Sequence, residues 1–85
     1  MIQKPKEVHN MAYYNEKMNA YRYLRQVLMT ALNEGKELNR TALILEMTSK
    51  FPTSDIAIKK RLDMYEELGY ISSTGSTIKT NKELP

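Results

Sequence analysis

The stretch from residue 53 to residue 80 limits the possible folds of this 85-residue chain more than any other part. Four of its apolar residues recur at three- and four-residue steps, which is the spacing of one helical face. These residues are Ile58, Leu62, Tyr65 and Leu68. Gly69 follows, and glycine commonly ends a helix because it adopts a left-handed conformation at no steric cost. The stretch therefore predicts an amphipathic helix with a defined end.

The same stretch carries signals for a helix start and for a hairpin after the helix. The hydroxyl of Ser54, or of Thr53 before it, can accept a hydrogen bond from an unpaired amide of the first turn. A strand is expected to begin at Tyr70, and the small polar residues 73–76 favour a turn. Residues 77–80 then supply the return strand. Residues 53–80 thus read as helix, glycine stop and β-hairpin.

Two further helices are predicted before this stretch. The first covers about residues 11–33, and the second covers residues 40–51, with Asn39 as its cap and Pro52 as its stop. Residues 37–38 are expected to form a short strand between them. The apolar stripe of the first helix is formed by Tyr14, Met18, Tyr21, Leu24, Leu28 and Leu32. The buried face of the second is formed by Leu43, Ile44, Met47 and Phe51.

Composition places the chain among ordinary globular domains. Apolar residues make up 41% and charged residues 27%, and 85 residues suffice for a single domain. We expect this domain over residues 11–80, between a flexible polar leader (1–10) and a frayed tail (81–85). Cysteine is absent, no apolar run approaches a membrane span, and the N-terminus does not resemble a secretory signal. A cytoplasmic protein is therefore expected.

The predicted elements resemble a winged helix-turn-helix domain over roughly residues 38–80. Ile58, Leu62, Tyr65 and Gly69 have the spacing that leads from the recognition helix of that family to its terminating glycine. Met47 precedes Ile58 by eleven residues, as a buried residue of the preceding helix does in the family. The resemblance implies a mostly α fold with a small β-hairpin: three helices plus a wing, here with a long N-terminal helix. It further implies sequence-specific binding of double-stranded DNA, as in compact regulators of prokaryotic chromosomes, plasmids and archaeal viruses.

The resemblance also implies which residues meet DNA. The recognition helix, about residues 54–68, would enter the major groove, and the wing, residues 70–80, would lie near the backbone. Lysines would neutralise phosphates, hydroxyls would donate to them, and the N-terminus of the second helix would help to hold one. Asp55 could accept from a cytosine amino group or serve only the helix dipole. The candidate contacts are Arg40, Thr41, Ser54, Asp55, Lys59, Lys60, Arg61, Thr74, Ser76 and Lys79.

The first helix has an unusual number of tyrosines near its start, which suggests a homodimer. Tyr13, Tyr14 and Tyr21 point around more than one helical face, and a small domain often needs a partner to bury enough apolar surface. The alternative is that tyrosine simply tolerates half-exposed positions. A net charge of +3 and a pI of about 9.2 permit a polyanionic partner without requiring one.

Other functions remain open at this point. Winged helices also serve as protein-interaction modules, and a DNA partition or packaging adaptor would bind duplexes with little sequence preference. An enzyme is not expected, because the single histidine, His9, lies in the leader and the adjacent Glu66 and Glu67 diverge on a helix. The sequence offers no Cys/His cluster and no glycine-rich phosphate loop, so no metal, cofactor or small-molecule ligand is predicted.

Overall fold

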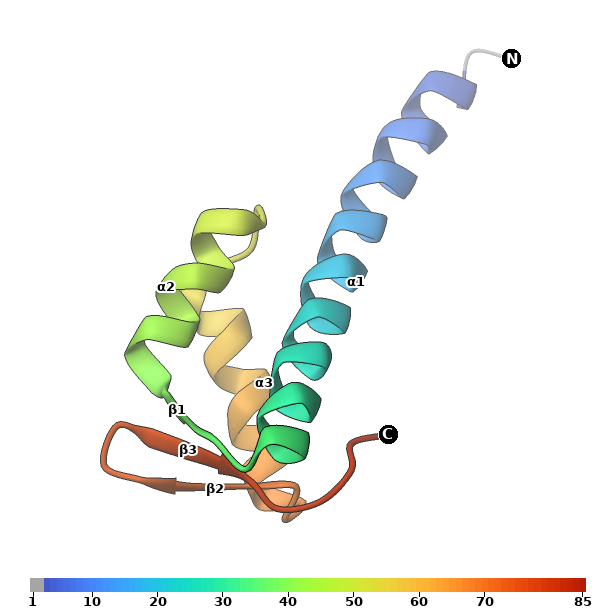
Figure 1. Ribbon diagram of the computed structural model, residues 1–85. Coiled ribbons are helices and arrows are strands. Elements are labelled where there is room, and N and C mark those ends of the chain that lie inside the picture. Colours follow the sequence, from blue (N-terminus) through green and yellow to red (C-terminus); the bar gives the residue numbers. More distant parts are fainter. Residues whose placement is uncertain (1–2) are drawn as a thin grey trace.

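The computed structural model describes the backbone of residues 3–85 and the side chains of residues 18–85. Its elements are α1 (Gln3–Glu34), β1 (Glu37–Asn39), α2 (Arg40–Lys50), α3 (Asp55–Glu67), β2 (Ile71–Thr74) and β3 (Thr77–Thr80). Figure 1 shows the hairpin of β2 and β3 below the helices, with β1 leading from α1 into α2. The prediction of a mostly helical fold with a small antiparallel sheet is confirmed, and the layout is compatible with the winged-helix arrangement.

The three strands form one antiparallel sheet in the order β1-β3-β2. Ile78 of β3 lies at its centre, because it is opposite Leu38 of β1 on one side and Ser73 of β2 on the other. Gly75 has a positive φ of 62° in the turn between β2 and β3, a conformation that glycine adopts without strain. Thr80 then fixes β3 to α1 by donating its hydroxyl hydrogen to the carbonyl of Leu28 at 2.9 Å.

Local capping signals set the bounds of α2 and α3 as predicted. The Asn39 side-chain oxygen accepts from the Ala42 amide at 2.8 Å, and the Ser54 hydroxyl accepts from the Ala57 amide at 3.1 Å. Gly69 has a positive φ of 83° directly after the last turn of α3. These bonds satisfy amides that the first turn of a helix leaves without a partner. The direction of α3 is therefore fixed at both of its ends.

One core joins all three helices and the sheet. Its fully buried large side chains come from α1, α2, α3, β2 and β3, and they are Leu24, Leu28, Met47, Ile58, Leu62, Ile71 and Ile78. Tyr65 of α3 is also buried, and its ring meets that of Tyr70 edge-on at 6.2 Å between centroids. Because one side of α3 fills this core, the opposite side of α3 faces outward.

The first helix differs from its prediction at its start. It begins at Gln3, not near Met11, and so runs through most of the expected leader. Pro5 is compatible with this start because it lies in the first turn, where its missing N–H has no partner to lose. Figure 1 shows that α1 extends well past α2 and α3. The Met18 side chain is 43% exposed, although we predicted it to be in the apolar stripe of this helix.

Leu68 and the C-terminal residues also differ from prediction. Leu68, expected on the buried face of α3, is 56% exposed because it caps the helix after the last core-facing turn. Residues 81–85, expected to be a frayed tail, instead pack on α1. Leu84 is only 2% exposed, and the Arg25 guanidinium donates to the carbonyl of Pro85 at 2.8 Å. A buried leucine and a long-range hydrogen bond hold this end of the chain in place.

Candidate nucleic-acid interface

The outward side of α3 carries polar side chains along its N-terminal half. Ser54, Asp55, Lys59 and Lys60 are all exposed, whereas the core residues of the same helix are buried on the other side. The Ser54 hydroxyl accepts from the Ala57 amide, which leaves the hydroxyl hydrogen available for donation. This half of α3 therefore presents two ammonium groups, a carboxylate and a hydroxyl to solvent.

The two lysines differ in their electrostatic surroundings. Lys59 lies 3.3 Å from the Asp55 carboxylate one turn earlier, and both side chains are about half exposed. Such a pair contributes little in water, so a phosphate can replace the carboxylate as the partner of Lys59. Within residues 18–85, Lys60 forms no ion pair. Lys60 is therefore the less compensated of the two charges on this face.

A shallow groove between α2 and α3 brings Thr41 close to Lys59. The groove has a volume of about 520 Å³, and its lining combines hydroxyls with apolar side chains. Thr41 is exposed at the start of α2, where amide groups of the helix N-terminus add to the positive potential. The lining residues are Thr41, Ile44, Leu45, Thr48, Thr53, Asp55 and Lys59. The predicted contacts Thr41, Asp55 and Lys59 thus share one surface.

Arg40, which we predicted to bond a phosphate, makes contacts within the chain. Its guanidinium donates to Asp63 of α3 at 2.8 Å and lies 3.5 Å from the Ser73 hydroxyl of β2. Its backbone amide donates to the carbonyl of Ser76, in the turn between β2 and β3, at 2.6 Å. Arg40 therefore ties α2 to both α3 and the hairpin, and Asp63 offsets its charge.

Arg61 also makes an internal contact. Its guanidinium lies 3.9 Å from the ring centroid of Tyr21 on α1, which is the geometry of a cation–π contact. The contact joins α1 to α3 and leaves Arg61 half-buried at the flank of the outward face. Tyr21, predicted at a dimer interface, is also half-buried. The side chains of the other two predicted interface residues, Tyr13 and Tyr14, lie outside the described residues.

The predicted contact residues of the β2–β3 hairpin do not form one group. Thr74 and Ser76 are exposed on either side of Gly75 at the tip of the hairpin. Lys79 is exposed too, but it pairs in register with Glu37 of β1 and lines a small pocket near the C-terminal end of α1. The tip therefore offers hydroxyls, while the lysine lies at the other end of β3.

Ile56 is a residue of this surface that our list of candidates omitted. It is 61% exposed in the first turn of α3, and it shares a surface pocket with Ser54 and Lys60. The helical spacing of the sequence places Ile56 off the core stripe, so this signal could have identified it. The C-terminal half of the same face is acidic, with exposed Asp63, Glu66 and Glu67. The outward face is thus cationic and apolar near its start and anionic near its end.

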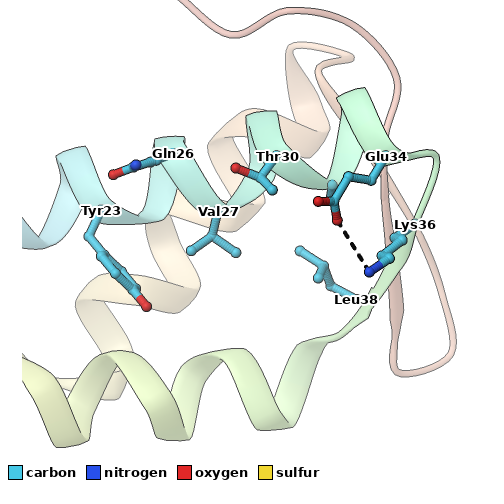
Figure 2. Close-up of a pocket in the computed structure, with 8 residues that line it drawn as sticks. Tyr23, Gln26, Val27, Thr30, Glu34, Lys36 and Leu38 are labelled. Carbon is cyan, nitrogen blue, oxygen red and sulfur yellow. Dashed lines mark ion pairs between the residues drawn. The ribbon is translucent and has the colours of Figure 1, made fainter.

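A second groove is lined by side chains of α1 and of the segment from α1 into β1, and it has a different character (Figure 2). Val27 and Leu38 form its apolar part, and it has a volume of about 430 Å³. Tyr23 borders it and donates its hydroxyl hydrogen to Glu46, which raises the pKa of the Tyr23 phenol above its ordinary value of 10.0. The groove has no lining residue from α3 among the described side chains. It therefore does not belong to the outward surface of α3.

Comparisons with protein-family models, with curated proteins and with solved structures found no match. In the part of the chain that the structure describes, no helix has the length and apolar character that crossing a membrane requires. No group of three or more possible metal-ligating side chains lies together among the described residues.

Proposed function

We propose that this chain is a winged helix-turn-helix protein of the cytoplasm that binds double-stranded DNA and regulates transcription. In this proposal α3 enters the major groove and the hairpin of β2 and β3 lies near the backbone. One observation carries the proposal: Ser54, Lys59 and Lys60 are exposed in the N-terminal half of α3, while its buried residues, Ile58, Leu62 and Tyr65, fill the core. A helix that binds in the major groove needs both a buried apolar side and an exposed polar side.

The charges of α3 favour an approach through its first two turns. Lys59 and Lys60 would neutralise phosphates there, and Ser54 would donate to a phosphate or a base edge. The exposed carboxylates Glu66 and Glu67 would be repelled by phosphate if the whole helix lay flat in the groove. In this proposal α3 therefore enters the major groove by its N-terminal end, and Thr41 of α2 lies beside the sugar-phosphate backbone of the DNA.

The long first helix supports a homodimer. It has 32 residues and extends beyond α2 and α3, and we place the contact with a second copy on its N-terminal half (Figure 1). Tyrosines at positions 13, 14 and 21 would supply apolar surface to that contact. A two-fold dimer would present two copies of α3, and half-sites about 34 Å apart would allow both to enter the major groove on one face of the duplex.

A salt-titrated binding experiment tests this function. The full chain is titrated into a fluorescent mixed-sequence duplex at increasing salt, and the same titration is repeated with unlabelled random duplex as competitor. We expect the logarithm of the affinity to fall linearly with the logarithm of salt, because each neutralised phosphate releases counterions. A sequence-specific regulator would stay bound to some of the labelled duplexes in the presence of the competitor. A packaging or partition adaptor would be displaced from all of them to the same extent. Absence of binding at low salt would refute both.

A protein-interaction module is the second candidate, and exposed apolar side chains favour it. Leu45, Met64 and Leu68 are exposed on α2 and α3, and such side chains are suited to a protein partner. This candidate predicts no binding of duplex DNA at any salt concentration. It also predicts that replacing Lys59 and Lys60 together by alanine leaves partner binding unchanged.

A further inference from the structure

Ile56 has an environment that the stability of the fold does not explain. Its side chain is 61% exposed, although Ile58, two residues later, is fully buried. An exposed isoleucine gains little from burial, and a β-branched residue is a poorer helix former than alanine, leucine or lysine. A leucine or a lysine at this position would serve the helix better. Like Leu45, which is equally exposed, Ile56 is therefore available to a binding partner.

Ile56 has a cationic side chain and a hydroxyl among its neighbours, as a residue that contacts base pairs in the major groove would. Lys60 lies one turn further along the same side of α3, and Ser54 precedes Ile56 by two residues, both lining the same surface pocket. Tyr21 of α1 and Arg61 also line this pocket, at its border with α1. On an approach through the first two turns, Lys60 would meet a phosphate while Ile56 would lie between the strands. An apolar side chain there meets the edges of base pairs, not the backbone.

One apolar group on the floor of the major groove distinguishes the base pairs. Thymine carries a methyl group at C5, and uracil, cytosine and guanine carry none in the groove. Building on the proposed function, we infer that Ile56 contacts a thymine methyl group and makes α3 prefer an A·T pair at that position. The preference arises from removing two apolar surfaces from water together, so it acts independently of the lysine contacts.

Removing only the methyl group from DNA tests this inference. Wild-type chain is titrated into two duplexes of equal length, one of alternating dA–dT and one of alternating dA–dU, at one low salt concentration. Burial of one methyl group predicts about fourfold tighter binding to the thymine duplex for each contact. The variant Ile56→Ala is expected to bind both duplexes equally, whereas Ile56→Val is expected to keep part of the preference.

A matched control and a second pair of duplexes separate the methyl contact from other differences. Leu68→Ala removes a similarly exposed apolar side chain (56%) from the far end of α3, and it should keep the full thymine preference. The second pair consists of alternating dG–dC duplexes with and without a 5-methyl group on cytosine, so the same methyl group lies on a different base pair. The wild-type chain should bind the methylated duplex more tightly.

Each outcome of this experiment has a distinct meaning. Equal binding of wild type to the thymine and uracil duplexes would overturn the role of Ile56 while leaving DNA binding in place. An undiminished thymine preference in Ile56→Ala, with an unchanged helical circular dichroism spectrum, would also overturn it. If wild type binds none of the duplexes at low salt, the proposed function fails and this inference fails with it.

Discussion

Leu62 and Leu45 show how differently one residue type contributes in this molecule. Leu62 is fully buried in the core, whereas Leu45 is 61% exposed beside the groove between α2 and α3. We expect Leu62→Ala to lower the free energy of unfolding by about 2–5 kcal/mol, through lost burial and a residual cavity. Leu45→Ala should change it by less than about 0.5 kcal/mol. Urea unfolding of both variants measures this, and equal losses would contradict the described core.

The hydrogen bond from Tyr23 to Glu46 makes stability depend on pH in the alkaline range. The bond raises the pKa of Tyr23 in the folded chain above its unfolded value. The stabilisation is therefore complete below the ordinary tyrosine pKa and is lost as pH rises through the raised pKa. We expect the stability difference between wild type and Tyr23→Phe to shrink as pH increases above about 10. Urea unfolding at several pH values measures it, and a constant difference would exclude this linkage.

The residues that the sequence predicts well are those whose partners lie nearby in the chain. Asn39 and Ser54 cap their helices through amides three residues later, and Gly69 adopts the left-handed conformation that its position suggests. The contacts of Arg40 with Asp63 and of Arg61 with Tyr21 were not predicted. They join different elements, so they depend on how those elements pack, which residue spacing does not encode.

At the scale of elements, the C-terminal segment is part of the fold. Leu84 is buried among core side chains, and Arg25 of α1 donates to the carbonyls of Leu84 and Pro85. We expect Leu84→Ala to lower the free energy of unfolding by about 2 kcal/mol, the lower end of the range for core leucines, because a chain end can move into the cavity. Glu83→Ala is the exposed control, with an effect below about 0.5 kcal/mol. If the two variants unfold at the same urea concentration, the segment does not pack as described.

The helices and strands were predicted correctly where the apolar spacing agreed with the residues that begin and end such elements. For α2, α3 and the hairpin, capping residues, Pro52 and the glycines mark the ends, and the structure has these elements at nearly the predicted bounds. For α1 the predicted start near residue 11 was too late, because the polar composition of residues 1–10 gives no apolar stripe, and Pro5 suits a first turn. The buried Leu84 could not be predicted, since a single leucine near a terminus has no periodicity.

At the scale of the whole molecule, the proposed dimer has a direct consequence for mass. The chain has a mass of 9.9 kDa, so we expect sedimentation at micromolar concentration to give about twice this value. Replacing Tyr13 and Tyr14 together by glutamate should return the mass to that of one chain, because charge in an apolar interface costs several kcal/mol. A wild-type chain that stays monomeric at all concentrations would rule out this interface and the paired docking that depends on it.

The central claim is that DNA meets the outward face of α3, and two charge-equivalent variants test it most directly. Lys60→Gln and Lys36→Gln each remove one positive charge, but Lys60 lies on α3 whereas Lys36 follows α1 and pairs with Glu34. The measurement is the slope of log affinity for duplex DNA against log salt concentration. We predict that Lys60→Gln reduces the magnitude of the slope by about 0.9, the value for one phosphate contact, and that Lys36→Gln leaves it unchanged. Equal slopes for the two variants would contradict the assignment of this face to DNA.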